Sequence, residues 1–465
     1  MSADGAPDGQ APPAPARDVW LLALIAEAAL LLAALAVTGA LSGVLSPDTS
    51  SYFGAAASPS PWGQPRNPIY GYLAGLLGGS ATTTGAVALA QALLHAASVF
   101  VLYGGARRAG IGGLGAFAFA SAALLAQSDL YHLRILAPEA PANACLLAGL
   151  GLTLAATRSV RALGRLIVPI ALVTGAGYVL RPTQLPAILI LPALYFLFAW
   201  RQRRDRRLLP PLALMLALAV PFLVQSGVRL RAVGDFNIVS FGGYQMSGLA
   251  AFMLDPVLIA RLPEDVRPFA QAVLERRQQQ EAAGTVPAAP LNSAGERSFV
   301  STALGYFDIY ARGYDNVLVN VIVPLLRGDD SWVVSNRKLT TFALATVRAA
   351  PLRYLAWVGG ATARLVGHAL ATNAPMLVAT ALWLVTLLFA FLCGRDGAHA
   401  EVGAVSLLAL AWFACNGALP VLITFPAARY IDSAAALLPA IPLTRALALA
   451  IGCRAGAFDS SFRSS

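Results

Sequence analysis

The chain has 465 residues, of which 57 % are hydrophobic and 12 % charged, and its mean hydropathy is +0.66. Soluble domains average about 45–50 % apolar and about 25 % charged residues. So few charges cannot cover the apolar surface, which excludes a cytosolic enzyme, a disordered scaffold and a disulfide-rich secreted module. The apolar residues fall in blocks of about 17–25, the length that a helix needs to cross a bilayer. The sequence predicts an all-α polytopic membrane protein.

The net charge of +10 comes almost entirely from arginine, because Lys338 is the only lysine in the chain. These arginines cluster in short loops between apolar blocks, where the positive-inside rule accounts for them. The charge therefore indicates membrane topology rather than binding to nucleic acid. The four cysteines and four histidines show no metal-ligand spacing, so we expect no metal site and no disulfide framework.

About ten blocks are candidate transmembrane helices, and the first follows a Pro- and Ala-rich tail that predicts disorder. That first block is too long for the apolar region of a signal peptide, so we expect it to be retained. The predicted spans cover 19–45, 82–104, 111–127, 138–157, 164–180, 184–200, 208–228, 374–393, 401–423 and 431–451.

The loops between these spans form two sets that differ in arginine content, with eleven arginines in one set and four in the other. The richer set comprises 105–110, 158–165, 201–207 and 394–400, and the poorer set 46–68, 128–137, 181–183 and 424–430. The positive-inside rule places the richer set in the cytoplasm. Both termini are then cytoplasmic, and the poorer set lies outside.

This topology predicts five parts of the chain. Residues 1–18 form a disordered cytoplasmic tail, and 19–228 a transmembrane module of about seven helices. Residues 229–372 form one large external segment, followed by C-terminal transmembrane helices over 373–453 and a cytoplasmic tail over 454–465.

Within the external segment, glycine pairs and β-branched residues over 231–248 predict turns and a short strand. Residues 264–284 predict a charged soluble helix, followed by a Pro/Ala-rich loop. Two further helices are expected over 338–371, broken at Pro351.

The second of these helices is amphipathic, which favours a position along the membrane interface rather than across the bilayer. Its polar stripe contains Arg353, Trp357, Arg364 and His368. Its apolar face consists of Leu352, Leu355, Val358, Leu365, Val366 and Ala369.

The first external loop, 46–68, carries polar residues that membrane insertion does not require. Asp48 follows the first span, with Tyr52 four residues later and Arg66 before the next apolar stretch. A carboxylate at a membrane rim can accept a proton from an acceptor hydroxyl. Alternatively, Asp48 is the N-cap of a short interfacial helix.

Two other external positions carry arginine. Arg181 interrupts a long apolar stretch, where it can bind a phosphate or extend to the lipid headgroups beside Pro182. Arg429 and Tyr430 precede the last span and are also typical of interfacial residues.

Two acidic residues have a structural and a functional interpretation. Glu139 lies in the first turn of a predicted helix, where the helix dipole favours an acid, so a structural or supporting role is expected. Glu27 lies inside the first span, where an ionisable residue indicates function unless it faces a neighbouring helix and stays protonated.

The sequence contains no P-loop, GxSxG or HExxH motif and no DxD or ExD pair. A nucleotide-sugar enzyme that depends on a divalent cation is therefore not expected, and no cofactor is predicted.

In chain order, PDTSSY (47–52), RNPIY (66–70), LRPT (180–183), APLRYL (350–355) and ARYID (428–432) form an ordered set. This set resembles the GT-C glycosyltransferases, in particular the bacterial branch related to protein O-mannosyltransferases and aminoarabinose transferases. The family often has a second acid close to the first, whereas here the next candidate is Glu139.

The resemblance implies a helical enzyme of the bacterial inner membrane whose active site lies at the external face. A polyprenyl-phosphate-linked sugar is the expected donor, and a lipid, glycan or protein the acceptor. Asp48 matches the family's catalytic base. The residues expected to bind substrate are Arg66, Arg181 and Arg429 at the donor phosphate and Tyr52, Tyr70, Glu139 and Tyr430 around it.

Two alternatives belong to other classes of protein. A transporter or flippase of a lipid-linked or small polar substrate would use Glu27 as its coupling residue, but the halves of the chain show no internal repeat. A structural assembly subunit would account only for the external segment.

Overall fold

The structure, a computed structural model, describes residues 18–46, 48–79, 84–203, 207–286, 317–326, 331–372, 378, 381–382, 399–423 and 432–448. Within these residues the protein is helical, and its only β-type pairing is an isolated bridge between Val44 and Ile135. The prediction of an all-α protein is confirmed for the described chain. The short strand predicted within 231–248 is wrong, because helix α10 extends to Val233 and helix α11 begins at Gly242.

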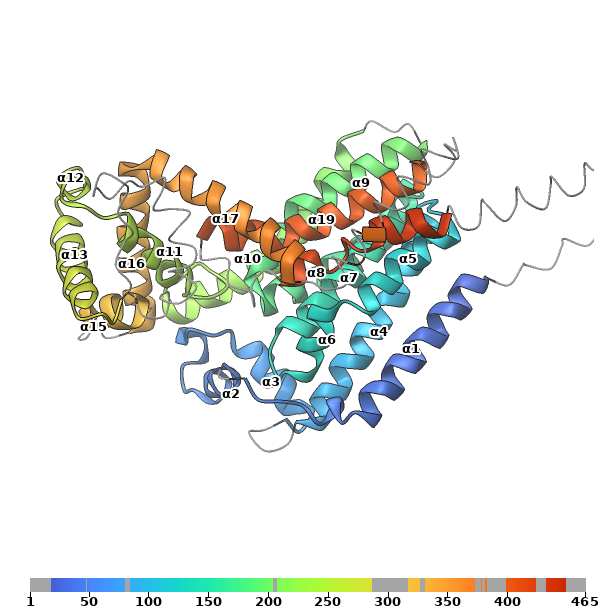
Figure 1. Cartoon of the computed structure of the whole chain (residues 1–465), viewed down its shortest axis with the longest axis horizontal. Coiled ribbons are helices and arrows are strands. Elements are labelled where there is room, and N and C mark those ends of the chain that lie inside the picture. The colour runs from blue at the N-terminus through green and yellow to red at the C-terminus, as the bar shows by residue number, and fades with distance from the viewer. Residues whose placement is uncertain are drawn as a thin grey trace, which may run out of the picture.

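Most helices pack into one bundle (Figure 1). Both ends of the described chain lie at the end of this bundle that is remote from the second group of helices, which is described below. Short helices at the other end of the bundle connect its long members. The bundle contains α1 (Val19–Val37), η1 (Ala40–Ser42), α2 (Thr49–Ala57), η2 (Pro61–Gly63), α3 (Pro68–Leu76), α4 (Gly85–Arg108), α5 (Gly113–Leu124), α6 (Gln127–Arg134), α7 (Glu139–Ala156), α8 (Val160–Leu180), η3 (Pro182–Gln184), α9 (Ala187–Arg203), α10 (Leu209–Val233), α19 (His399–Ile423) and η5 (Asp432–Ala435).

A second group of helices, here called the peripheral unit, extends from one end of the bundle (Figure 1). It contains α11 (Gly242–Met253), α12 (Pro256–Ala260), α13 (Arg267–Ala282), η4 (Leu318–Ile322), α15 (Val323–Leu325) and α16 (Trp332–Ala349). Helix α17 (Pro351–Thr372) leads from this unit back to the bundle.

Three predictions for the segment 229–372 can be compared with these helices. Helix α13 confirms the charged helix predicted over 264–284, and α16 and α17 confirm two helices that are broken at Pro351. The assignment of Trp357 to a polar stripe of α17 is wrong, because its side chain is 1 % exposed and packs in a core with Ala361 and Leu365. Leu352 and Leu355 remain exposed on the same helix.

Within the described residues, seven helices are long and apolar enough to cross a membrane, or eight if the bent pair α5 and α6 counts as one span. The chain is therefore a multi-pass membrane protein. These helices correspond to seven of the predicted spans, although α1 ends at Val37 instead of 45, and the bent pair overlaps the span predicted over 111–127 and continues to Arg134. The span predicted over 374–393 lies almost entirely outside the described residues, and the one predicted over 431–451 opens with the 3-10 helix η5.

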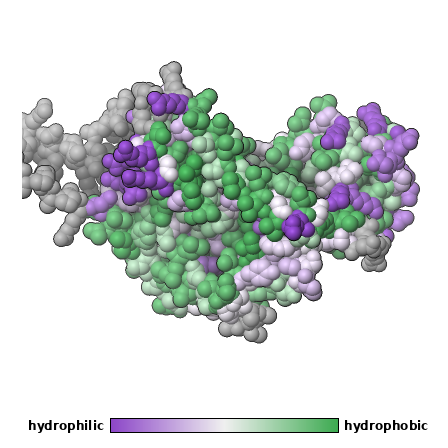
Figure 2. Space-filling view, turned by 180° about the vertical axis from the view of Figure 1, so that it is seen from behind, coloured by the Kyte–Doolittle hydropathy of each residue, from purple (hydrophilic) through white to green (hydrophobic). Residues whose placement is uncertain are grey.

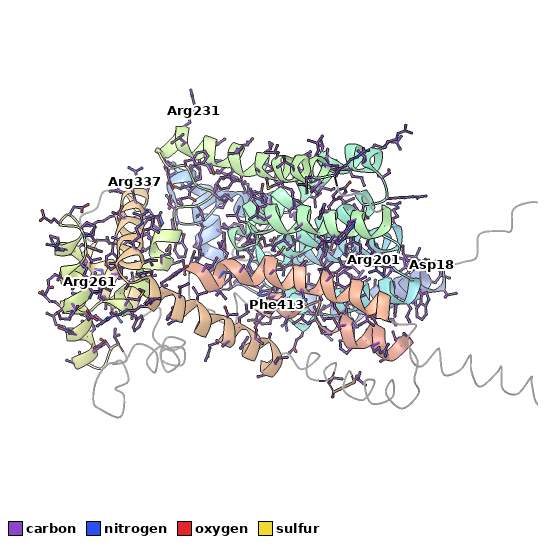
Figure 3. All side chains as sticks on the ribbon, turned by 90° about the horizontal axis from the view of Figure 1, so that it is seen from above. Asp18, Arg201, Arg231, Arg261, Arg337 and Phe413 are labelled. Carbon is purple, nitrogen blue, oxygen red and sulfur yellow. The ribbon has the colours of Figure 1, made fainter. Side chains whose placement is uncertain are left out.

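Apolar side chains cover the flank of the bundle, and hydrophilic side chains gather at its end and over the peripheral unit (Figure 2). Asp18 and Arg201 lie at the far end of the bundle, whereas Arg261 and Arg337 lie on the peripheral unit at the opposite end of the molecule (Figure 3). The loops predicted to share a side do meet: Gln202 donates a hydrogen bond to the carbonyl of Ala109. At the other end, Val44 pairs with Ile135.

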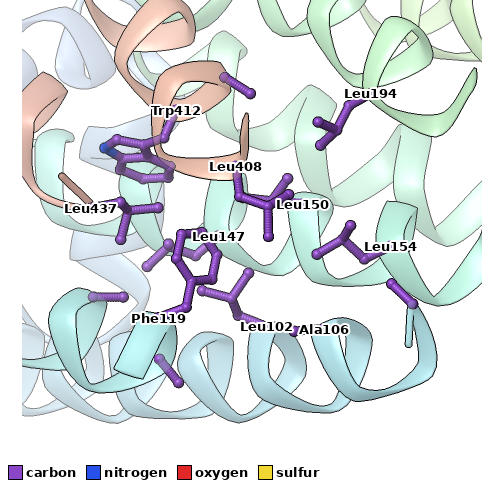
Figure 4. Packing of buried hydrophobic residues seen from close by; sticks show 14 of the residues in the cluster. Leu102, Ala106, Phe119, Leu147, Leu150, Leu154, Leu194, Leu408, Trp412 and Leu437 are labelled. Atoms are coloured by element: carbon purple, nitrogen blue, oxygen red, sulfur yellow. The ribbon is translucent and has the colours of Figure 1, made fainter. Parts of the chain in front are cut away.

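The bundle core is built from leucine, alanine and a few aromatic side chains that interdigitate between α4, α5, α7, α9 and α19 (Figure 4). Trp412 on α19 lies against Leu437, and Phe119 on α5 lies near Leu102 and Leu147. The peripheral unit has a separate core, to which α17 contributes Trp357.

Two glycines allow α4 and α7 to pack with their backbones in contact. A Cβ atom added to Gly105 would overlap the carbonyl oxygen of Gly151, and one added to Gly151 would lie 2.7 Å from Leu102 Cα. Small residues at helix crossings have this role in membrane proteins, because close backbone approach maximises van der Waals contact. The crossing sets the position of α7, whose first turn carries Glu139.

We expect Gly105→Ala to lower the free energy of unfolding by about 1–3 kcal/mol, because the added methyl group forces α4 and α7 apart. Gly104→Ala is the matched control, since its Cβ would meet no atom within 4 Å and alanine favours a helix. Thermal unfolding of both variants in detergent measures the difference. Equal stability of the two variants would show that the α4/α7 crossing tolerates a side chain.

Candidate functional site

One cavity of about 240 Å³ opens where the bundle meets the peripheral unit. Five of the predicted site residues line it, namely Asp48, Tyr52, Arg66, Glu139 and Arg181. Arg429 and Tyr430 lie outside the described residues. The cavity thus brings together residues that are up to 133 positions apart in the sequence.

The first loop is fixed to the bundle by backbone and hydroxyl hydrogen bonds. The Val44 amide donates to the carbonyl of Arg134 (2.6 Å), and the Leu136 amide donates to the carbonyl of Val44 (3.0 Å). Thr49, the first residue of α2, donates its hydroxyl to the carbonyl of Leu136 (2.8 Å). Asp48 is therefore held at a fixed place beside the start of α7.

Asp48 occupies the N-cap position of α2, as one of the two interpretations expects, but its side chain makes no capping hydrogen bond. Instead its Oδ1 accepts a hydrogen bond from Arg66 Nη2 at 2.8 Å in an ion pair. The two side chains are 34 % and 20 % exposed, so both remain accessible from the cavity. The carboxylate points to the cavity-lining arginine rather than to its own helix.

Arg66 is held by rings on two sides. Its Cζ lies 5.3 Å from the centroid of the Tyr52 ring and 5.2 Å from that of Phe241, and its Nε donates to Ser51 Oγ at 3.3 Å. A guanidinium is attracted to the face of an aromatic ring at such distances. Since Phe241 immediately precedes α11, Arg66 joins the first loop of the bundle to the peripheral unit.

Phe241 is itself part of an aromatic stack. Its ring lies 6.1 Å from Trp332 with an interplanar angle of 10°, and 6.0 Å from Tyr244 with an angle of 15°. The indole Nε1 of Trp332 donates to the carbonyl of Ser240 at 2.6 Å. This stack fixes the cavity wall that faces Arg66.

The same wall is anchored by Arg229, whose side chain is fully buried at the end of α10. Its guanidinium donates to the carbonyl of Trp62, to Ser240 Oγ, and to Asp235 Oδ2 at 3.1 Å. A buried arginine needs such partners, because an uncompensated charge is costly. The segment 237–239 between these anchors therefore lines the cavity in a defined conformation.

Arg181 occupies the break between α8 and η3, and its residue is 5 % exposed. It lines the cavity that also contains Asp48 and Arg66. Asn67 ties the two arginine-bearing loops together, because its Nδ2 donates to the carbonyl of Val179 at 2.9 Å. Asn67 also caps α3 by accepting from the Ile69 amide.

The remaining sequence candidates take different places. Glu139 lines the cavity from the first turn of α7, as predicted for its helix position. Tyr70 does not line the cavity, but packs edge-on against Tyr52 (5.5 Å) and donates to Gln91 Oε1. Burial, reinforced by the charge of Glu139, raises the pKa of Tyr70, so its phenol stays protonated and supports Tyr52.

Glu27 lies away from the cavity on α1, where its Oε1 accepts a hydrogen bond from Ser121 of α5 at 2.7 Å. It thus faces a neighbouring helix, which is one of the two interpretations of its position. Among the described residues no group of three or more His, Cys, Asp or Glu side chains could hold a metal ion.

The sequence did not indicate the apolar half of the cavity or the aromatic stack. Leu180, Leu185, Ile238, Leu419 and Ile423 form the apolar wall. Each is unremarkable in a chain that is 57 % hydrophobic, so only the fold distinguishes them. The cavity combines two guanidinium groups and two acidic side chains with this wall, so it is polar on one side and apolar on the other.

We expect Arg66→Lys to destabilise the protein by about 1–2 kcal/mol, because an ammonium cannot stack as a plane between two rings while binding Asp48. Arg348→Lys on the exposed face of α16 is the control and should leave stability unchanged. Thermal unfolding in detergent measures both. If the two variants have the same melting temperature, the contact of Arg66 with the rings of Tyr52 and Phe241 does not stabilise the protein.

Comparison with known proteins gives no further guide to the site. No family model, no curated protein and no solved structure matches the chain.

Proposed function

We propose that the protein is a membrane glycosyltransferase that moves a sugar from a polyprenyl-phosphate donor to an acceptor hydroxyl on the extracytoplasmic side. The observation that carries the proposal is the cavity in which Asp48, Arg66 and Arg181 meet an apolar wall. The sequence resemblance supports the same reaction. In this proposal the chain lies in the bacterial inner membrane with both termini in the cytoplasm.

The shape and chemistry of the cavity suit a donor with a charged head and an apolar tail. Arg181 would bind the phosphate through its N–H donors, since guanidinium groups match phosphate geometry. The polyprenyl chain would lie against Leu180, Leu185 and Leu419, which belong to helices long and apolar enough to cross a membrane. A donor held in this way presents its sugar toward Asp48.

The chemistry then follows from the carboxylate. Asp48 accepts the proton of the acceptor hydroxyl while that oxygen forms a bond to the anomeric carbon. The bond between this carbon and the phosphate oxygen breaks, and the polyprenyl phosphate leaves with the electron pair. Arg181 stabilises the charge that develops on the leaving group. Arg66 orients Asp48 through Oδ1.

The alternative of a transporter coupled through Glu27 receives no comparable support. Glu27 is not among the side chains that line the cavity, and its carboxylate is hydrogen-bonded to Ser121 within the bundle. Arg429 and Tyr430 remain predicted substrate-binding residues.

Asp48→Asn should lower the rate of sugar transfer about 10²–10⁴-fold, because the amide cannot accept the proton. The measurement is transfer from radiolabelled polyprenyl-phosphate sugars in membrane vesicles, with the donor chosen as the lipid-linked sugar that accumulates when the protein is inactivated. Glu275→Gln on the exposed face of α13 is the control. Unchanged transfer by Asp48→Asn would remove Asp48 as the base.

Arg181→Gln should weaken binding of undecaprenyl phosphate about 10–100-fold, the effect expected for the loss of hydrogen bonds to a charged group. Titration of the lipid into the protein in nanodiscs measures this affinity. Arg261→Gln, at the exposed end of α12, removes a charge far from the cavity and should bind as the wild type does. Equal loss in both variants would mean that the lipid responds to net charge only.

A further inference from the structure

A buried polar network lies behind Arg181, and Asn143 is its centre. The Nδ2 of Asn143 donates to Asp129 Oδ1 at 2.7 Å and to Ser433 Oγ at 3.0 Å, and its Oδ1 accepts from Gln184 Nε2 at 2.9 Å. One amide therefore joins α6, η3 and η5 to α7. Asp129, Asn143, Gln184 and Ser433 are each at most 1 % exposed.

The network reaches Arg181 through the 3-10 turn that follows it. Gln184 is the last residue of η3, and its backbone amide donates to the carbonyl of Arg181 at 3.0 Å. Its side chain also lies 3.4 Å from Asn416 Oδ1 on α19. Fixing the Gln184 side chain thus fixes the backbone conformation from which the Arg181 side chain enters the cavity.

The network also contains a buried carboxyl group that interacts electrostatically with Arg181. Asp129 is buried, and the positive charge of Arg181 acts on its carboxylate. The same arginine acts on His132, on the next turn of α6, together with the acidic groups of Glu139 and Asp432. A buried carboxyl group is costly unless it is hydrogen-bonded, and Asn143 supplies such a bond to Asp129.

We infer that Asp129 and Asn143 are positioning residues that hold the Arg181 guanidinium in its phosphate-binding arrangement. Asp129 interacts with Arg181 through its carboxyl group and holds the Asn143 amide, and Asn143 transmits this position to the η3 turn through Gln184. The inference rests on the proposed function only in taking the bound anion to be a phosphate. The geometry of the η3 turn does not depend on that function.

Three isosteric variants test the inference with little change in packing. Asn143→Asp places two carboxylates in contact, and Asp129→Asn removes the charge. The double variant Asp129→Asn/Asn143→Asp exchanges the two groups, which restores one amide-to-carboxylate hydrogen bond and still offers Gln184 an acceptor. Thr153→Val on α7 is the control, because Thr153 is buried but bonds only to its own helix at Gly149.

Two measurements on the full chain in nanodiscs distinguish the positioning of Arg181 from a general contribution to helix packing. The first is the affinity for undecaprenyl phosphate, which each single variant should weaken at least about 10-fold and the double variant should recover to within about 3-fold. The second is hydrogen exchange of the backbone over 181–190, which should speed up in Asn143→Asp and return in the double variant. Thr153→Val should change neither.

The outcomes are distinct. If the single variants keep wild-type affinity and exchange, or if the double variant recovers neither, the positioning role is overturned. If the wild type does not bind undecaprenyl phosphate, the proposed function fails, and hydrogen exchange alone then supports or overturns the positioning of the η3 turn.

Discussion

The low polarity of the bilayer is the constraint on which the rest of the structure depends. Charged groups inside a span are costly, so the chain can concentrate them only where helices end. Asp48, Arg66, Arg181 and Glu139 all lie at helix ends or in the loops between helices. A cavity that is lined by these ends is consequently charged on one side and apolar on the other.

Within this cavity the two arginines have unequal surroundings. Arg66 is committed to the Asp48 carboxylate and to the rings of Tyr52 and Phe241. Arg181 is buried, and its turn is held by the amides of Gln184 and Asn143. In the proposed function, the first arrangement would orient the base, and the second would hold the cation that binds the donor phosphate.

Much of this could be predicted from the sequence, because charge in an apolar chain is a strong signal. Asp48, Arg66 and Arg181 stood out as polar residues that topology does not require, and they share one cavity. Asn143 gave no such signal, since a single amide in an apolar helix can face lipid, a groove or a partner. Trp357 was placed on the wrong face because helical periodicity shows that a helix has two sides but does not show which side has a neighbour.

The geometry of the site also depends on the position of the peripheral unit. Phe241 stacks on Arg66 from a segment that is fixed by Arg229 and Trp332. Rotation of that unit by even a small angle would separate the ring from the guanidinium, because the attraction between them falls off beyond about 6 Å. The orientation of Asp48 is therefore coupled to the docking of the peripheral unit, which the cavity-lining segment between α10 and α11 connects to the bundle. A ligand that contacts both walls would stabilise this docking, and its binding would in turn fix the carboxylate.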